Sequence, residues 1–320
     1  MSNFLIENFS FRKVLQDVKE KSIFIGATSF ESRCTEAVKL IRNYSSVNNF
    51  DFYIANIEDD KNYYRDQCSD LQNKNRLVIK NLLDKTRKTF IDGMLSKSDE
   101  VVGKIQNLIA GKESDIFFDI STVPTKIFFP IVKFLFKNIN YDHKIYIIYT
   151  SVINYPHWLS KDPEEVSYIS GFVGSYSGGK KHIWIPILGF EGGLAKKVYE
   201  NGSYVDICPV IGFPSIMIDR VLYANKDIID KLQNGINDIR YSPLYDPFEM
   251  YKTVKSIITG YGQEDAHFTI SPFGTKPQSL GCCVLAIEED LSVMYAQPQT
   301  YNPKYSEGMG NIYAYLLKRI

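Results

Sequence analysis

The chain has 320 residues, more than a single hydrophobic core usually serves, so its length predicts two domains. Lysine plus arginine and aspartate plus glutamate each number 37, and the formal net charge is zero. This balance argues against long nucleic acid as the main partner, because proteins that bind it carry an excess of basic residues. Hydrophobic residues make up 44% and charged residues 23% of the chain, which excludes global disorder.

The first half of the chain alternates short apolar runs, typical of buried strands, with patterns typical of helices. Strands are expected at 22–26, 51–57, 76–79, 115–120 and 144–151, and helices up to residue 41, over 99–110 and up to residue 136. Strands that alternate with helices predict right-handed crossovers and a mainly parallel sheet.

The second half repeats this alternation. Strands are expected at 183–189, 205–211, 238–242, 267–271 and 292–297, and helices up to residue 199, over 218–234 and up to residue 287. Residues 161–181 between the halves are rich in Pro, Gly and Ser and are expected to form a linker or a hairpin. The predicted domains are therefore residues 1–160 and 182–320.

Three short motifs recur in the same order in both halves. Phe30-Glu31 matches Phe190-Glu191 after the first strand, and Thr125-Lys126 matches Thr275-Lys276 after the fourth. A polar segment containing Asn-Pro or Asn-Tyr-Pro then follows the last strand of each half, at 154–156 and 301–303. Because the order is kept, the matches indicate an internal duplication. The predicted fold is α/β, with two tandem Rossmann-like units related by a pseudo-two-fold axis.

The cysteines and histidines show no pattern typical of disulfides or metal sites. The five cysteines are odd in number and include no CxxC pair, and there are four histidines. The N-terminus lacks the basic start and apolar run of a signal peptide. The most apolar stretch, residues 127–136, contains Pro130 and Lys133 and is too short for a membrane span. We expect a cytoplasmic protein with no metal, no resident cofactor and no membrane contact.

The repeated turns lie at the carboxyl ends of predicted parallel strands, where ligands of open α/β sheets bind. A helix start there offers backbone N–H groups and the positive end of the helix dipole to an anion, and each Lys adds a charge. We expect the following residues to converge on one cleft between the halves: Gly26, Ser29, Glu31, Thr125, Lys126, Gly189, Glu191, Gly274, Thr275 and Lys276.

Each of these motifs also has a simpler interpretation. The Thr-Lys turns can be plain helix entries, with Thr as the N-cap and a solvated Lys. Glu31 and Glu191 can be first-turn acids that interact with the helix dipole, acceptors for a ribose or base, or general bases. Arg33 has no counterpart at Gly193, so it would act in one half only. The aromatic segment around Tyr301 can stack on a base or simply pack the chain terminus.

The chain lacks both GxGxxG and GxxxxGK[ST], which argues against the usual dinucleotide site and against a Walker motif. Residues 271–277, SPFGTKP, instead resemble the Gly-Thr-Lys turn of the CARF domain, a cyclic-oligoadenylate sensor of CRISPR-associated proteins. Residues 121–126 are similar, with Pro124 where that family has Gly. Two such units in one chain resemble the SAVED domain of bacterial anti-phage systems, which binds cyclic oligonucleotides.

The resemblance implies a sensor, or a sensor subunit with an effector protein as partner. It would bind a small phosphorylated nucleotide between the two halves. Effectors of these families usually carry a nuclease, protease or membrane module, and the two halves leave no residues for one, so the resemblance implies a stand-alone sensor, a subunit of a larger complex, or a Rossmann-like enzyme that has kept the topology. An enzyme that acts on a nucleotide or nucleotide-sugar, with Glu31 or Glu191 as acid or base, is the alternative. A non-catalytic scaffold is the second. The sequence leans away from an enzyme, and its catalytic residues stay unassigned.

Overall fold

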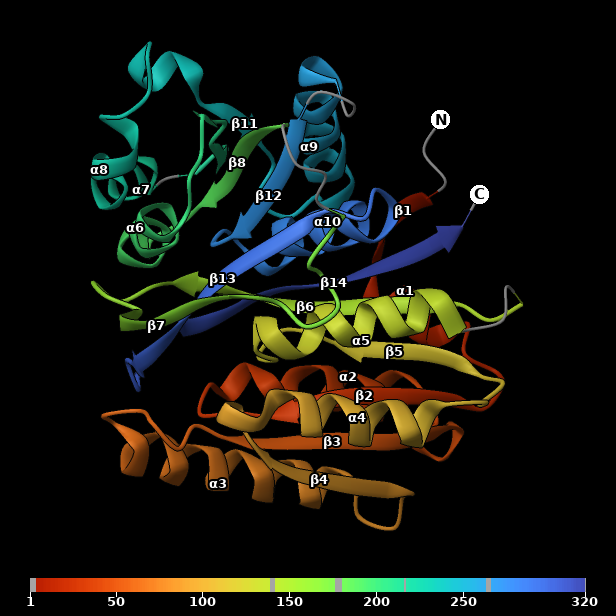
Figure 1. Ribbon diagram of the computed structural model, residues 1–320. Coiled ribbons are helices and arrows are strands. Elements are labelled where there is room, and N and C mark those ends of the chain that lie inside the picture. Colours follow the sequence, from red (N-terminus) through yellow and green to blue (C-terminus); the bar gives the residue numbers. More distant parts are fainter. Residues whose placement is uncertain (1–3, 139–141, 176–179, 216, 263–265, 320) are drawn as a thin grey trace. The chain divides into compact units, whose positions relative to one another are not determined.

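The chain forms two compact units in a computed structural model, which describes residues 4–138, 142–175, 180–215, 217–262 and 266–319 (Figure 1). Unit 1 holds residues 1–157 and 301–320, and unit 2 holds residues 158–300. Each unit contains one mostly parallel sheet with helices, so the predicted α/β class and the two Rossmann-like units are confirmed. Among the described residues, no helix is long and apolar enough to cross a membrane.

Unit 1 is built on a seven-stranded sheet of order β1-β14-β6-β5-β2-β3-β4. Its strands are β1 (Phe4–Ser10), β2 (Ser22–Thr28), β3 (Phe50–Glu58), β4 (Lys88–Met94), β5 (Asp115–Asp119), β6 (Ile145–Asn154) and β14 (Glu307–Arg319). Its α-helices are α1 (Phe11–Gln16), α2 (Glu36–Tyr44), α3 (Arg65–Leu82), α4 (Ser98–Ile109) and α5 (Thr125–Asn138). The five neighbouring strands β6, β5, β2, β3 and β4 are parallel to one another. Strand β14 is antiparallel to both of its neighbours, β6 and β1.

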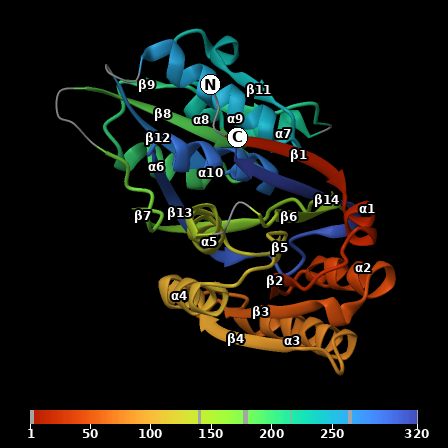
Figure 2. The same cartoon turned by 90° about the vertical axis from the view of Figure 1, so that its right-hand side faces the viewer.

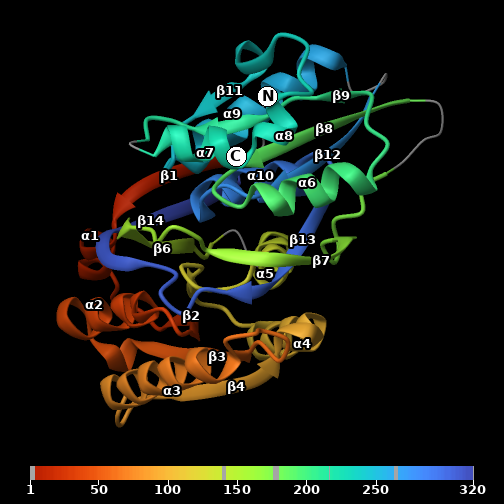
Figure 3. The same ribbon diagram turned by 90° about the vertical axis from the view of Figure 1, so that its left-hand side faces the viewer.

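The core of unit 1 lies on both faces of this sheet, which is why its central strands are continuously apolar. Every residue of β2 is buried. Helices α1, α2 and α3 cover one face, and α4 and α5 lie on the other (Figure 3). On the first face Phe117 stacks on Tyr146 with ring centroids 4.9 Å apart and meets Phe50 edge-on at 5.3 Å. These aromatic contacts bury large apolar areas between strands that are far apart in sequence.

Unit 2 is built on a second sheet of order β11-β10-β8-β12-β13-β7, with β9 paired to β8. Its strands are β7 (Ser160–Tyr168), β8 (Lys181–Leu188), β9 (Asp206–Ile207), β10 (Val210–Gly212), β11 (Arg240–Ser242), β12 (Ala266–Pro272) and β13 (Ser292–Tyr301). Its α-helices are α6 (Gly192–Asn201), α7 (Ile218–Ala224), α8 (Lys226–Ile229), α9 (Pro247–Tyr261) and α10 (Lys276–Glu288). The five neighbouring strands β11, β10, β8, β12 and β13 are parallel to one another.

The two sheets have the same strand order. The series β6-β5-β2-β3-β4 of unit 1 matches β13-β12-β8-β10-β11 of unit 2, and β14 lies beside β6 as β7 lies beside β13 (Figure 2). The Phe-Glu pairs follow the equivalent strands β2 and β8, and the Thr-Lys pairs begin the helices after the equivalent strands β5 and β12. The motifs that indicated a duplication in the sequence therefore lie on equivalent elements.

Each half of the chain also supplies a strand to the sheet of the other half. Strand β7 follows β6 along the chain but joins the sheet of unit 2, next to β13. Strand β14 follows β13 but joins the sheet of unit 1, between β6 and β1. We call β7 and β14 the exchanged strands. The exchange is reciprocal, because both leave their own half at the equivalent point.

The structure differs from the sequence-based elements in several places. Residues 76–79, expected as a strand, belong to α3, whose buried residues Cys68, Gln72 and Ile79 are spaced at helical intervals; the strand beside β3 is β4 instead. The single helix expected over 218–234 is replaced by two short helices, α7 and α8, which end at Ile229. The single strand expected at 205–211 is replaced by β9 and β10, which are interrupted at residues 208–209. The expected linker, 161–181, contains most of β7, and residues 301–320, expected in the second domain, belong to unit 1. Both differences at the boundary follow from the strand exchange.

Two histidines face each other across β8 and β12. His182 and His267 are opposite in the register, with ring centroids 5.0 Å apart. His182 Nε2 lies 2.8 Å from Thr269 Oγ1, and His267 Nε2 lies 3.2 Å from Ser292 Oγ. Burial lowers the pKa of both imidazoles, and the charge of His267 lowers the pKa of His182 further.

We expect this pair to reduce the stability of unit 2 as the pH falls below about 6.5. The unfolded chain protonates both imidazoles near that pH, whereas the folded chain does so only at lower pH, so acid favours unfolding. The variant His182→Gln, which keeps a polar partner for Thr269, should lose less stability than wild type between neutral and mildly acidic pH. Urea unfolding across this range measures the difference, and parallel profiles for the two proteins would contradict the prediction.

Candidate functional site

The carboxyl ends of the unit 1 strands carry a row of polar side chains. Thr28, Asn56 and Asp92 are register partners on β2, β3 and β4. Thr28 Oγ1 donates to Asn56 Oδ1 at 2.6 Å, and Asn56 Nδ2 donates to Asp92 Oδ1 at 2.9 Å. Gln72 of α3 donates to the same Asn56 oxygen at 3.2 Å, and Arg76 forms an ion pair with Asp92 at 3.0 Å. Hydrogen bonds thus link three strand ends, a position where open sheets bind ligands.

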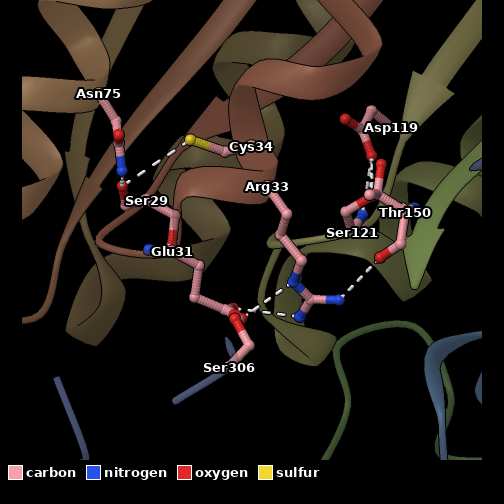
Figure 4. Close-up of polar contacts among 9 residues, drawn as sticks. All are labelled: Ser29, Glu31, Arg33, Cys34, Asn75, Asp119, Ser121, Thr150 and Ser306. Carbon is pink, nitrogen blue, oxygen red and sulfur yellow. Dashed lines mark hydrogen bonds and ion pairs between the residues drawn. The ribbon is translucent and has the colours of Figure 1, made fainter. Parts of the chain in front are cut away.

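A buried ion pair lies in the turn after β2. Arg33 Nε and Nη2 donate to the two carboxylate oxygens of Glu31 at 2.9 and 3.1 Å, and Arg33 Nη1 donates to the carbonyl of Thr150 at 3.0 Å (Figure 4). Glu31 and Arg33 are only 8% and 6% exposed. The Arg33 guanidinium also lies 5.8 Å from the ring centre of Tyr149, and the charge of Glu31 raises the pKa of Arg33 despite its burial. The pair is bidentate and joins the β2 turn to β6.

Asp119, the last residue of β5, is a second buried acid beside this pair. Its Oδ1 accepts hydrogen bonds from the backbone N–H and the hydroxyl of Ser121, at 2.9 and 2.5 Å (Figure 4). Ser121 Oγ in turn accepts the N–H of Thr150 at 2.7 Å. Burial raises the pKa of Asp119 to about 6, although Ser121 and the charge of Arg33 oppose the rise. A carboxyl group with this pKa exchanges protons near neutral pH, as acid–base residues do.

Aromatic rings and a serine from the chain before β14 cover the β2 turn. Phe30 contacts Tyr301 and Tyr305, with ring centroids 6.2 and 6.3 Å apart. Ser306 Oγ donates to Glu31 Oε2 at 2.7 Å (Figure 4). The aromatic segment therefore packs on the β2 turn, at the carboxyl edge of the sheet.

The other predicted residues of unit 1 lie on the same edge. Gly26 is inside β2, and Ser29 closes the turn after it, because Ser29 Oγ accepts the N–H of Glu31 at 3.2 Å. The Ser29 carbonyl accepts a hydrogen bond from Asn75 at 2.8 Å (Figure 4). Thr125 is buried and Lys126 half-buried in the first turn of α5, which follows β5, the neighbour of β2. The hydroxyl of Ser29 thus has a local structural role.

In unit 2 the turn after β8 packs closely against the turn after β12. A Cβ atom at Gly189 would lie 2.1 Å from the carbonyl oxygen of Phe273, and one at Gly274 would lie 2.8 Å from a side-chain carbon of Ile187. Asn225 also donates to the carbonyl of Gly189 at 2.7 Å. Close packing of the two turns therefore explains both glycines.

Thr275 is the N-cap of α10 and forms a capping box with Gln278. Thr275 N donates to Gln278 Oε1 at 3.1 Å, and Thr275 Oγ1 donates to the carbonyl of Leu244 at 2.6 Å. Pro277 has no N–H, and the N–H of Gln278 is directed to Thr275. The simpler interpretation, helix entry, thus holds for Thr275. The backbone at the start of α10 therefore offers an anion fewer free donors than the motif predicted.

Glu191 accepts a hydrogen bond from a serine, and the charge of a lysine acts on its pKa. Ser160 Oγ, at the first position of β7, donates to Glu191 Oε1. Burial raises the pKa of Glu191, while the Ser160 hydrogen bond and the positive charge of Lys276 oppose that rise. The preceding Phe190 carries the guanidinium of Arg220 at 4.1 Å from its ring centre. This edge of unit 2 thus holds two cationic side chains and one acid.

The structure brings the predicted residues together within each unit. Gly189, Glu191, Gly274, Thr275 and Lys276 share the adjoining turns of β8 and β12, and Gly26, Ser29 and Glu31 share β2 and its turn, next to the β5–α5 turn. The single cleft between the halves stays a prediction. No group of three or more His, Cys, Asp and Glu in the described ranges is placed to hold a metal ion.

Sequence reasoning missed Asp119, Asn56 and Asp92. Asp119 is a polar residue at the end of an apolar strand, DIFFD at 115–119, and that signal was available; Asn56 and Asp92 lie inside β3 and β4 and have no such signal. It also left Arg33 without a role and did not notice Ser160 and Ser306, because a serine in a polar segment has no distinguishing pattern. No protein-family model matches this chain, and a comparison with curated proteins gives no significant match.

Proposed function

We propose that the protein binds a small phosphorylated nucleotide at the carboxyl ends of its parallel strands, with Lys276 of unit 2 as the main phosphate contact. The supporting observation is that Lys126 and Lys276 occupy equivalent first-turn positions after the equivalent strands β5 and β12. In open α/β sheets this edge is the usual place for a ligand, and a helix start favours negative charge.

Further features of unit 2 fit an anionic nucleotide. Lys276 is the first residue of α10, a helix of 13 residues, so the dipole and the ammonium group act in the same direction. Arg220 lies over Phe190 at the neighbouring turn and adds a second cation. The chain as a whole is neutral, which favours a small ligand over a long nucleic acid.

The biological setting of this proposal rests on the CARF-like and SAVED-like motifs. By that resemblance the ligand would be a cyclic oligonucleotide, and the protein a cytoplasmic sensor, or sensor subunit with an effector partner, in anti-phage defence. The equivalent strand order of the two units agrees with two such units in one chain.

An enzyme that acts on a nucleotide is the second candidate, and the observation that favours it is Asp119. Glu31, one of the two acids expected in this role together with Glu191, is bound on both carboxylate oxygens by Arg33. Asp119 instead has a pKa raised to about 6 by burial and lies at the carboxyl edge of β5. If the protein turns a nucleotide over, Asp119 is the acid–base residue we propose.

The variant Lys276→Ala should weaken nucleotide binding by roughly tenfold to a hundredfold, because a charge-assisted hydrogen bond contributes on the order of 1.5–3 kcal/mol. Calorimetric titration with cyclic di-, tri- and tetra-adenylate, ATP and NAD measures this. Affinity should also fall with added salt, since charges attract the ligand.

Lys252→Ala is the matched control for this titration. Lys252 is an exposed lysine inside α9 of unit 2 that pairs with Glu249 of the same helix. Its loss removes the same charge and should leave affinity within about twofold of wild type. Equal weakening in both variants would point to a general charge effect, and no binding to wild type below the millimolar range would refute the proposed function.

A further inference from the structure

Two exposed aromatic side chains lie at the carboxyl edge of the unit 2 sheet. Tyr241 is the middle residue of β11, and Phe213 directly follows β10. Their rings meet edge-on, with centroids 5.8 Å apart. Phe213 is 52% and Tyr241 is 48% exposed, so about half of each side chain is open to solvent. Single exposed apolar residues are common in folded proteins, whereas two rings in contact form a small aromatic surface. We call these two residues the aromatic pair.

The backbone of the sheet holds the aromatic pair in place. Tyr241 is the register partner of Ile211 in β10. The N–H of Phe213 donates to the carbonyl of Ser242 at 2.9 Å, so the hydrogen bonding between the two strands continues to Phe213. Both rings are therefore attached to paired backbone. A ligand that stacks on them does not have to order a loop first, which lowers the entropic cost of binding.

Hydrogen bonds also connect the aromatic pair to the start of α10, the helix that carries the proposed phosphate contact. The Ser242 carbonyl that accepts the N–H of Phe213 accepts Gln278 Nε2 as well, at 3.5 Å. Two residues further along, the carbonyl of Leu244 accepts Thr275 Oγ1 at 2.6 Å. The chain that leaves β11 thus contacts both the end of β10 and the first turn of α10.

The strand order places the aromatic pair and the cations in one row. Neighbouring strands follow in the order β11, β10, β8 and β12. The aromatic pair lies on the first two, Phe190 with Arg220 over its ring follows β8, and Lys276 begins the helix after β12. Because neighbouring strands are about 4.8 Å apart, β10 and β12 are about 10 Å apart. An aromatic surface at one end and cations at the other correspond to a nucleotide, which has its base and its phosphates at opposite ends.

We propose that the aromatic pair binds a nucleobase of the ligand by stacking, while Lys276 binds its phosphate. The inference rests on the proposed function, because it concerns the same ligand. It narrows the ligand class, since inorganic phosphates and sugar phosphates have no ring to stack on the pair. Stacking uses the π-face that every base has, so these rings accept a base without reading its hydrogen-bonding edge.

Calorimetric titration of the full chain separates the base contact from the phosphate contact. The probes are ATP, cyclic tetra-adenylate and inorganic tripolyphosphate, which has phosphates and no base. Phe213→Ala and Tyr241→Ala should each weaken nucleotide binding by about tenfold, the order expected for the loss of one stacked ring. Neither variant should change the affinity for tripolyphosphate, whereas Lys276→Ala should weaken the binding of all three probes.

Conservative variants distinguish a stacked ring from apolar bulk or a loss of fold. Phe213→Leu keeps an apolar side chain without a ring, so it should weaken nucleotide binding about as much as Phe213→Ala. Tyr241→Phe keeps the ring and should bind as wild type does. The fluorescence of 2-aminopurine riboside triphosphate, which falls when the base stacks, gives a direct signal. At saturation wild type should quench it, and Phe213→Ala should quench it less.

Tyr44→Ala is the matched control for the loss of an exposed ring. Tyr44 ends α2 in unit 1, on the chain that leads to the amino end of β3. It is 39% exposed and contacts the guanidinium of Arg12, which lies 5.0 Å from its ring centre. Its replacement should leave the affinity for all three probes within about twofold of wild type.

The outcomes separate this inference from the proposed function. Unchanged nucleotide affinity in both aromatic variants, with weaker binding in Lys276→Ala, would overturn the base contact and leave the proposed function standing. Weaker nucleotide binding in the aromatic variants, with wild-type binding in Lys276→Ala, would support the base contact and count against Lys276 as the phosphate contact. No binding of either nucleotide to wild type would overturn both.

Discussion

Replacing Arg33 with methionine is expected to destabilise the protein by about 3–5 kcal/mol, the usual cost of leaving one charge of a buried pair without its partner. Arg33 and Glu31 are both nearly fully buried, and the guanidinium also binds the carbonyl of Thr150. Removal of Arg33 leaves the Glu31 carboxylate with Ser306 as its remaining side-chain donor among the contacts described above. Urea or thermal unfolding of the full chain measures the loss.

A double variant separates the charge effect from lost packing. Arg33→Met combined with Glu31→Gln removes both charges, so it should recover a large part of the stability lost in Arg33→Met. Arg65→Met is the matched surface control, because Arg65 pairs with Glu58 at 3.8 Å with both side chains about half exposed. Its effect should stay below about 1 kcal/mol. A double variant as unstable as Arg33→Met would show that the guanidinium acts mainly through packing and its bond to Thr150.

Replacing Asp119 with asparagine is expected to stabilise the protein above pH 6, by on the order of 2–3 kcal/mol at pH 8. Burial raises the pKa of Asp119 from 3.8 to about 6 in the folded chain. Between these values the folded chain holds a proton that the unfolded chain has released, so the carboxyl group costs stability as the pH rises through that range. Asparagine keeps an oxygen to accept the two Ser121 donors and carries no charge.

The way in which the stability difference between Asp119→Asn and wild type changes with pH tests this prediction. The advantage of Asp119→Asn over wild type should be largest at pH 8 and shrink steadily toward pH 4, as measured by unfolding at several pH values. Asp115→Asn, the same change at the half-exposed start of β5, reports the effect of the substitution itself and should stay within about 1 kcal/mol. If Asp119→Asn is less stable than wild type at pH 8, the carboxylate makes a net favourable contact with Arg33.

The expected gain in stability also bears on function. A carboxylate that destabilises its own fold is typical of residues retained for binding or chemistry. Asp119 ends β5, the strand before the Thr125-Lys126 turn, and hydrogen-bonds through Ser121 to β6. A variant that is more stable but binds or turns over a nucleotide less well would place Asp119 in the functional site of unit 1.

The sequence by itself determined the α/β class, the parallel central strands and the position of the repeated motifs. These follow from local patterns: β2, β5, β8 and β12 each contain a run of apolar residues and are buried apart from the first one or two residues of β5 and β8, because helices cover both faces of a parallel sheet. The entry into α10 was also readable, since Thr275 is its N-cap, Pro277 lies in its first turn and Gln278 completes a capping box with Thr275, all from neighbouring residues.

Tertiary structure alone decided which sheet each edge strand joins and which partners the buried polar groups find. Strand β7 has an exposed, polar sequence that resembles a linker, and its place depends on pairing with β13, more than 120 residues away in the chain. The same holds for Arg33, whose role arises from contacts with Glu31 beside it and with Thr150 far along the chain. Polar residues at strand ends have no periodicity, so their pairing and their pKa values emerge only when distant strands come together and exclude water.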